Sequence, residues 1–454
     1  MVVLWPDFPV CQKLFPSEYR VKTFRVSGTA AAAVLLGPTA ALAAPSPDEM
    51  AFIFNTMSFL VNGALVCAMA IGFCMLEVGM VRTKSAGAIC MKKVGLYSLA
   101  AVTYALLGYN LMYDGVDGGY IGSLSLFEVA DPASETAEAS YSVASDWFFQ
   151  MVFVGTVASI VSGAVAERVK VSGFLWVAFV IVALIYPIQG AWSWGGGWLS
   201  ELGFSDFAGS TIVHSVGGWC ALSGVILLGA RRGKYSPDGT VNPMQASAVP
   251  LVALGTFVLW LGWLGFNGGS QLALASVEDA SAMSRVYANT YLAGCGGALA
   301  ATAVYYGFYR RLDVTLILNG ALGGLVSITA EPLTPTFIQA ILIGGVGGVI
   351  VAVGVPFLDR VKLDDVVGAI PVHLFCGIWG TIAVCITNPD ASFGAQLTGI
   401  IAVGLFAFLV SMLAWYVVKL AMGIRLDDED EMQGSDAVEI GLVSYPEFVP
   451  GRAT

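Results

Sequence analysis

Long apolar stretches separated by short polar segments follow one another along most of the chain. Eleven such stretches can be delimited between residues 52 and 422. At about 1.5 Å per residue, helices of this length cross the roughly 30 Å of hydrocarbon in a bilayer. Apolar and polar positions do not alternate, as they would in barrel strands. We therefore expect an all-α integral membrane protein with eleven transmembrane helices, at about 52–80, 94–113, 146–166, 173–191, 209–229, 248–267, 287–308, 314–330, 336–357, 369–387 and 394–422.

The composition supports the same class of protein. Hydrophobic residues make up 57% of the chain and charged residues only 12%, about half the charged share of a typical soluble domain. This excludes an ordinary cytosolic enzyme, a disordered chain and a nucleic-acid-binding protein. The 8 cysteines are scattered without a C-x-x-C pair. We interpret them as small packing residues, and we expect no metal and no cofactor.

The first 44 residues have the pattern of a secretory signal peptide. Lys22 and Arg25 precede an apolar stretch over 26–42, which is followed by the small residues Ala43 and Ala44. An additional transmembrane helix is the alternative. We favour the signal peptide because the apolar stretch is short and rich in alanine. The chain then divides into a signal peptide over 1–44, a transmembrane domain over 45–425 and an acidic cytoplasmic tail over 426–454.

The basic residues gather on one side of the predicted helices. With the mature N-terminus outside, 16 of the 17 Lys and Arg residues after residue 44 fall on the inner side, and only Arg285 falls outside. This positive-inside bias predicts a multi-pass protein of the plasma (inner) membrane with a cytoplasmic C-terminus. The outer loop at about 114–145 is acidic. It is either a solvated loop or a surface that gathers cations.

The two histidines of the sequence occur in a repeated setting. Asp206 precedes His214 by eight residues, and Asp365 precedes His373 by eight residues. Each pair lies at the start of a predicted helix, the fifth for His214 and the tenth for His373. The two helices therefore have equivalent places in two halves of five helices each. Because five is an odd number, the two halves cross the membrane in opposite directions. The spacing predicts an inverted repeat of five plus five helices with an added eleventh, and a functional site near the membrane midplane.

These histidines are the first candidates for chemistry, because ionisable groups inside a membrane helix are rare and usually functional. His214 and His373 would face each other as neutral imidazoles, and one hydrogen bond would fix both tautomers. The alternatives are a structural imidazole bonded to a backbone carbonyl, and a metal site, for which the sequence lacks further ligands. Asp206 and Asp365 stand at helix starts, where a carboxylate caps free N–H groups. Asp206 would also stabilise a cation in an outer vestibule.

Aromatic side chains and one hydroxyl gather on the third, fourth and sixth predicted helices, toward their outer ends: Phe149, Phe153, Trp194, Trp263, Phe266 and Ser270. Taken singly, each is explained as an interfacial belt residue or as bundle core. Taken together, ring faces and a hydroxyl would hold a small cation, and deeper phenyl rings would form a hydrophobic gate.

Glu77 lies near the inner end of the first predicted helix. We expect it to pair with Arg82 or Lys84 at the membrane interface. A buried, functional carboxylate is the alternative. Glu167 and Arg168 close the third helix in a similar way.

Several segments resemble the Amt/Mep/Rh ammonium transporters, and most closely the Amt branch. The resemblance covers roughly residues 50–425 and is carried by the residues 149–153, 163–168, 206–214, 263–267 and 364–373. Within the first predicted helix, the segment 72–79 is similar to the plant-like and cyanobacterial type. The tail segment 434–441 is similar to the family's tail motif, with Ile440 where a histidine is usual.

The resemblance implies a role for each candidate residue. Trp194, Phe153 and Ser270 match the outer site that recruits ammonium. Phe149 and Phe266 match the gate, while His214, His373 and Trp263 match residues that line the pore. Asp206 matches an acid that is needed for structure and conduction. The family also implies a homotrimer with one pore per subunit, controlled by a PII-type signalling protein on the cytoplasmic face.

We therefore expect ammonium uptake in which the cation is recruited outside, deprotonated and conducted as ammonia, with separate proton transfer. Three rival functions remain open at this point. They are an ammonium sensor, a membrane-embedded enzyme that uses the histidines as acid and base, and a neutral gas channel of Rh type. The short tail argues against the sensor, and the lack of a nucleophile argues against the enzyme. Trp194 and Ser270 argue against the gas channel, because they would form a cation site.

Overall fold

The computed structural model describes residues 46–129 and 140–448. These residues form helices, with two isolated β-bridges and no longer strand among them. Nine helices of this part of the chain are long and apolar enough to span a membrane. The expectation of an all-helical, multi-pass membrane protein is therefore confirmed. The predicted signal peptide over 1–44 lies outside the described residues.

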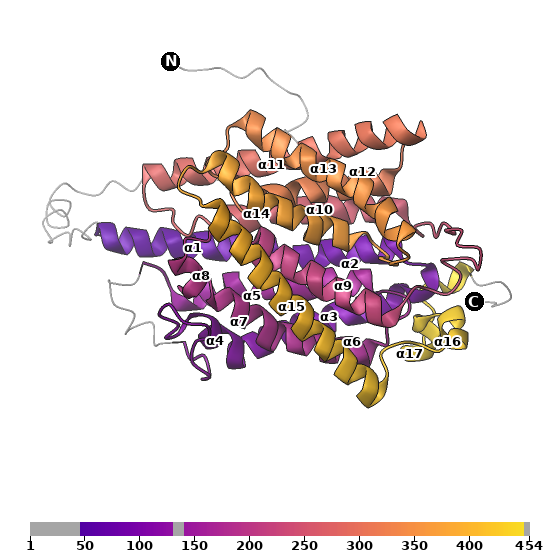
Figure 1. The fold of residues 1–454 in the computed structure, drawn as a ribbon. Coiled ribbons are helices and arrows are strands. Elements are labelled where there is room, and N and C mark those ends of the chain that lie inside the picture. The colour runs from indigo at the N-terminus through magenta and orange to yellow at the C-terminus, as the bar shows by residue number, and fades with distance from the viewer. Residues whose placement is uncertain (1–45, 130–139, 449–454) are drawn as a thin grey trace, which may run out of the picture. The chain divides into compact units, whose positions relative to one another are not determined.

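The helices of the first half run from indigo to magenta in Figure 1. Their bounds are α1 (Pro47–Cys67), α2 (Met69–Met80), η2 (Thr83–Ser85), α3 (Ala86–Thr103), η3 (Tyr104–Gly108), α4 (Tyr109–Tyr113), α5 (Val143–Ala164), α6 (Val171–Val180), η4 (Ile181–Ile185), α7 (Tyr186–Ala191), α8 (Trp198–Glu201), η5 (Ser210–Ser215) and α9 (Val216–Leu228). The segments η3, η4 and η5 are π-helical turns that continue directly into the following α-helix.

The second half of the described chain has longer helices with fewer interruptions. Its elements are α10 (Val249–Gly269), α11 (Val277–Tyr309), α12 (Val314–Ile328), α13 (Phe337–Arg360), the π-helical η6 (Ile370–Phe375), α14 (Cys376–Thr387), α15 (Phe393–Met422), α16 (Asp428–Gln433), α17 (Ser435–Glu439) and η7 (Pro446–Phe448). The nine candidate spans do not include α11, or α12, which has only 15 residues. Both pack against α13.

The second helix begins earlier than its predicted start at residue 94. Hydropathy places Lys92 and Lys93 at the membrane interface, but both are buried inside α3. The Lys92 Nζ donates to the carbonyl of Ser162 (3.0 Å), and Lys93 lies 2.5 Å from the Glu77 carboxylate. A charged group can enter a helix bundle when such partners replace water, and one sequence window does not reveal partners on other helices.

Glycine allows α11, α12 and α13 to approach one another at backbone distance. A Cβ atom added to Gly344 of α13 would lie 2.1 Å from the carbonyl oxygen of Ala293 in α11. One added to Gly297 of α11 would lie 2.2 Å from the carbonyl oxygen of Gly320 in α12. No real side chain fits at these distances, so van der Waals contact between backbones holds the three helices together.

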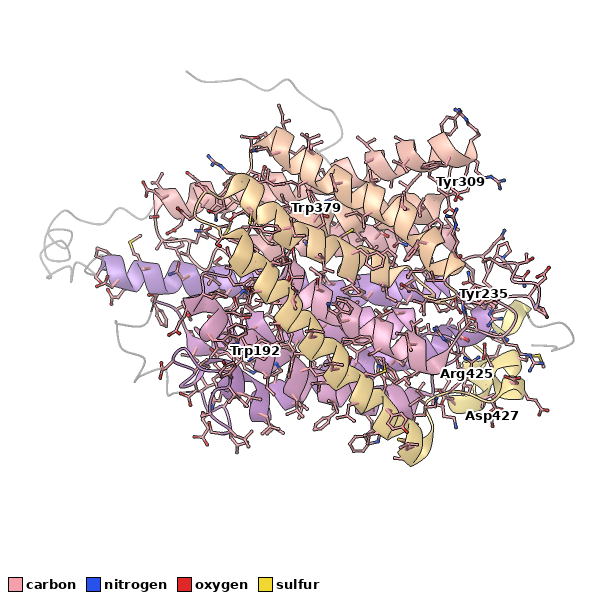
Figure 2. The ribbon with its side chains drawn as sticks, in the orientation of Figure 1. Trp192, Tyr235, Tyr309, Trp379, Arg425 and Asp427 are labelled. Carbon is pink, nitrogen blue, oxygen red and sulfur yellow. The ribbon has the colours of Figure 1, made fainter. Side chains whose placement is uncertain are left out.

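The C-terminal segment docks at one end of the bundle, which we call the tail end; the opposite end, with residues 114–129, is the loop end. The N–H of Lys170 donates to the carbonyl of Ile424 (2.9 Å). Asp436 accepts from the N–H of Ala88 (2.8 Å), and Glu439 accepts from the N–H of Val171 (2.7 Å). Carboxylates of the tail therefore cap the starts of α3 and α6. Figure 2 marks Arg425 and Asp427 where the chain leaves α15 for these tail helices.

A buried charge network joins three connections between helices at the tail end. The Arg231 guanidinium donates to both carboxylate oxygens of Asp364 (2.9 Å each) and to Glu167 (2.8 Å). Glu167 also binds Arg82. Burial raises the pKa of Asp364, but hydrogen bonds from Arg231 outweigh burial and hold it well below its usual range. The stabilisation is therefore complete above the pKa of an unfolded aspartate and is lost as the pH falls toward the folded value.

Substitution of Asp364 by Asn should destabilise the fold strongly. Removing one partner of a buried ion pair leaves the other uncompensated, at a cost of about 3–5 kcal/mol. The matched control is Asp428→Asn, because the Asp428 side chain is 70% exposed in its pair with Arg232. We expect this control to lose less than about 1 kcal/mol. Unfolding in detergent at neutral pH measures both, and equal losses would contradict the structural role of the network.

Candidate functional site

A cavity of about 320 Å³ opens at the loop end between α4, α5, the turn that follows α7 and the C-terminal end of α10. Its lining combines aromatic rings with polar groups: Tyr109, Tyr113, Tyr141, Asp146, Phe149, Gln150, Phe153, Trp194, Phe207, Ser270 and Leu272. Four of the residues singled out in the sequence, Phe149, Phe153, Trp194 and Ser270, therefore line one cavity. The Ser270 hydroxyl donates to the carbonyl of Phe266 (2.8 Å), which leaves its oxygen free to accept or bind a further group.

Three phenyl rings close the floor of this cavity. The rings of Phe153 and Phe266 stack with centroids 3.9 Å apart, and Phe149 meets Phe153 edge to face at 4.9 Å. All three side chains are almost completely buried. Close stacking leaves no space for water between the rings, so the floor is an apolar barrier that must open for anything to pass.

The two histidines meet directly below this barrier. Nδ1 of His214 lies 3.2 Å from Nδ1 of His373, and the rings are nearly parallel, at 24°. In a hydrogen bond between the two rings, one Nδ1 donates and the other accepts, so two neutral imidazoles in this contact would have opposite tautomers. Nε2 of His214 is buried and has no hydrogen-bond partner among the described residues. The structural alternative, an imidazole bonded to a backbone carbonyl, does not account for this contact between the rings.

Trp263 holds the ring of His214 from the other side. The indole stacks on the imidazole with centroids 4.8 Å apart and an angle of 19°. Its Nε1–H donates to the hydroxyl of Thr329 (2.8 Å), which in turn donates to the carbonyl of Leu325 (2.7 Å). The tryptophan is thereby fixed in orientation, and the histidine it covers can rotate little.

Asp206 acts as the cap of η5. Its carboxylate accepts four backbone N–H bonds of 2.8–3.0 Å, from Gly209, Ser210, Thr211 and Ile212. Gly209 has φ +108°, a conformation in which a side chain is strained. The Trp194 indole donates to the carbonyl of Asp206 (2.8 Å). Asp206 is not among the residues that line the outer cavity. It affects that cavity by the hydrogen bond that holds Trp194.

The second histidine has an equivalent support from the opposite end. Asp365 accepts from the N–H of Gly368 (3.1 Å) and of Ile370 (2.6 Å), at the start of η6. His214 and His373 therefore both stand in a π-helical turn that begins at an aspartate cap. A π-turn leaves more backbone groups without an intrahelical partner than an α-helix does, and the carboxylates supply acceptors for them.

Two further cavities continue below the histidines toward the tail end. The first is about 20 Å³, room for one water molecule, and its lining includes His373, Phe73, Glu77 and Ser159. The second is about 340 Å³ and opens among Arg231, Asp313 and Asp365. Both include Asn319 and Val367 in their lining. The cavities, the phenyl barrier and the histidines therefore follow one another through the bundle.

Glu77 corrects one expectation from the sequence. It does not pair with Arg82 or Lys84. Its side chain is 1% exposed, its Oε1 lies 2.5 Å from Nζ of Lys93, and the Ser162 hydroxyl donates to its Oε2 (2.8 Å). The alternative of a buried carboxylate is the one that the structure bears out. The local sequence around Glu77 could not reveal this partner, because Lys93 lies on the next helix.

Asp146 is a cavity residue that the sequence reading missed. Its carboxylate accepts from the hydroxyl of Tyr109 and from the amide of Gln150 (3.4 Å), and it is 7% exposed. The signal was present in the spacing, because residues 146, 149 and 153 share one face of a helix. Its place on the same helix face as the candidate rings of Phe149 and Phe153 would have marked Asp146 as a candidate for the cavity.

The fold and site define a polytopic helical membrane protein with cavities on both sides of a buried cluster of aromatic and histidine rings, and its similarity to known proteins gives its family. Residues 57–445 match the Ammonium Transporter Family, to which the chain belongs. The Synechocystis sp. protein sll1017 is 40% identical over 399 residues, covering 87% of this chain and 89% of that protein. Ammonium transporter Amt2 of Archaeoglobus fulgidus is 38% identical, covering 86% and 88%. The solved structure of a Sensor Amt Protein is 34% identical with a TM-score of 0.79, covering 85% and 98%.

Substitution of Asp206 by Ala should disrupt η5. Four buried N–H groups would lose their acceptor, and each unsatisfied group costs about 1–3 kcal/mol, so we expect a loss well above 2 kcal/mol. The control is Asp313→Ala at the start of α12, where the carboxylate accepts only one backbone N–H, from Leu316 (3.2 Å). Loss of such a cap costs about 1 kcal/mol. Unfolding midpoints compare the two, and an Asp206→Ala variant as stable as the control would refute the capping role.

Proposed function

We propose that the protein takes up ammonium across the plasma membrane. The proposal rests on one observation: an aromatic cavity, an apolar barrier and two facing buried imidazoles lie one after another through the bundle. The family supports the substrate, because Amt2 of Archaeoglobus fulgidus is named an ammonium transporter. A passage this dry suits a neutral molecule and not a hydrated ion.

The outer cavity is the proposed recruitment site. Trp194 and Phe153 offer ring faces to a small cation, and Ser270 offers a hydroxyl oxygen. A cation over such a ring gains about 0.5–2 kcal/mol. Asp206 supports the site by holding Trp194, as their hydrogen bond of 2.8 Å indicates. Asp146 adds a buried carboxylate in the same lining.

Selectivity follows from the cost of moving a charge through the barrier. Ammonium and potassium have similar size and charge, and either ion would lose its hydration between Phe149, Phe153 and Phe266 at a cost of several kcal/mol. Ammonium can instead release a proton and cross as ammonia, and potassium cannot. Below the barrier, His214 and His373 offer neutral nitrogen atoms that accept and pass on the proton. Transport in this scheme is electrogenic, because ammonia and the proton both cross.

The arrangement in the membrane follows from the same reasoning. We infer eleven transmembrane helices, with α11 and α12 among them, arranged as five plus five in an inverted repeat with α15 added. The capped π-turns of His214 and His373, which begin from opposite ends, support the repeat. The charge bias supports an outer N-terminus and an inner tail. The family resemblance supports a homotrimer, and a PII-type signalling protein is the proposed partner of the tail end.

The direct test of transport is to reconstitute the purified protein in liposomes and to measure the current across their membrane after an ammonium pulse. We expect current with ammonium and none with a matched potassium pulse. His214→Ala combined with His373→Ala should lower the ammonium current by roughly 100-fold, the usual contribution of a positioned acid or base, or make the pore permeable to potassium as well. An unchanged, selective current in this double variant would rule out the proton relay.

Recruitment can be tested at Trp194 and Ser270. Trp194→Leu and Ser270→Ala should each raise the half-saturating ammonium concentration, by about 2- to 30-fold if 0.5–2 kcal/mol is lost. Ser284→Ala is the matched control. Its hydroxyl donates to the carbonyl four residues earlier, as that of Ser270 does, but Ser284 does not line the outer cavity. An equal effect in the control would refute the site.

An ammonium sensor is the second candidate function, favoured by the similarity to the Sensor Amt Protein. In that case the cavity would bind ammonium and the docked tail would report it to a partner. The liposome experiment separates the two functions. Ammonium binding without current would support the sensor.

A further inference from the structure

A buried ion pair lies beside the passage and is not used in the transport scheme above. Glu77 of α2 and Lys93 of α3 are 1% and 4% exposed at their side chains, with 2.5 Å between Oε1 and Nζ. Both belong to candidate membrane spans. Taking two charges out of water is costly, and apolar side chains of similar volume often stabilise a protein as well or better. The pair therefore calls for an explanation beyond packing.

Only one member of the pair faces the passage. Glu77 lines the cavity of about 20 Å³ together with His373 and Ser159, whereas Lys93 is not part of that lining. Nζ of Lys93 instead lies 3.3 Å from the carbonyl oxygen of Ser159 and 5.0 Å from the ring centroid of Phe73. The carboxylate is exposed to the cavity, and the ammonium group stands behind it.

The neighbouring Lys92 shows how a purely structural lysine is placed. Its Nζ binds the Ser162 carbonyl and lies 5.0 Å from the ring centroid of Phe174 in α6. It lines neither of the two inner cavities, and among the described residues it forms no ion pair like that of Lys93 with Glu77. The contrast distinguishes Glu77, which has a counter-ion and also borders the same small space as a pore histidine.

We propose that Glu77 is the inner proton acceptor of the transport cycle. The protonated His373 gives up one proton, which passes through the single water site of the small cavity to a carboxylate oxygen of Glu77. The imidazole returns to its neutral form and Glu77 becomes a neutral carboxylic acid. The acid then releases the proton toward the large cavity at the tail end, and the carboxylate is restored. This inference rests on the proposed electrogenic uptake.

Lys93 makes protonation of Glu77 transient. While Glu77 is a carboxylate, the pair is neutral and the negative oxygen attracts a proton from the histidine. Once Glu77 is protonated, the ammonium group of Lys93 stands alone in a low-dielectric site, and this excess charge favours release of the proton. The pair therefore accepts the proton only transiently, as a relay requires. Asn319 and Val367, which border both inner cavities, mark the exit toward Arg231 and Asp365.

Substitution of Glu77 by Gln tests this role with two simultaneous readouts on the full-length protein in liposomes. Current after an ammonium pulse measures charge, and a pH-sensitive dye inside measures entry of neutral ammonia as alkalinisation. In the unaltered protein both proton and ammonia enter. In Glu77→Gln we expect the charge carried per ammonia to fall roughly tenfold or more, with alkalinisation in its place. A variant that only damaged the fold would lose both readouts together.

Two further variants make the outcome decisive. Glu167→Gln is the matched control, because Glu167 is an equally buried, ion-paired carboxylate that lines none of the described cavities; its charge per ammonia should be unchanged. The double variant Glu77→Gln with Lys93→Met removes both charges. It should still carry ammonia without current. Recovery of current in the double variant, or full current in Glu77→Gln, would overturn the proposal. Absence of current in the unaltered protein would instead refute the proposed function itself.

Discussion

Burial of backbone groups that lack a helical partner is the constraint on which the site depends. A π-helical turn inside a membrane protein leaves N–H groups that water cannot reach, and a carboxylate must satisfy them. Asp206 accepts four such groups ahead of His214, and Asp365 accepts two ahead of His373. Each cap fixes the start of its turn, and the two imidazoles that follow meet at 3.2 Å.

A dry passage follows from the way the rings pack around this pair. Phe153 and Phe266 close it on one side, and Trp263 covers the face of His214. Only about 20 Å³ is open on the other side. In such surroundings each polar atom has a large energetic effect, because little space is left for water to screen it. The two histidines and the ion pair of Glu77 with Lys93 are titratable side chains that lie in these surroundings.

The tail end is organised by ionic contacts, in contrast to the apolar middle of the bundle. Arg231, Glu167 and Asp364 tie together three connections between helices, and Asp436 and Glu439 cap two helix starts from the tail. A movement of the tail would therefore expose the first turns of α3 and α6. The helix α3 also carries Lys93, so tail and passage share one structural element.

The sequence by itself determined the class of fold, the approximate helices and the candidate residues. Hydropathy over about 20 residues is a local property, and the Asp–x₇–His spacing revealed the two equivalent helix starts. Only the tertiary structure decided which side chains meet. It joined Glu77 to Lys93 instead of Arg82 or Lys84, buried Lys92, and added Asp146 to the outer cavity. The partner of a buried charge lies on another helix, and its position depends on how the helices pack, which no local pattern encodes.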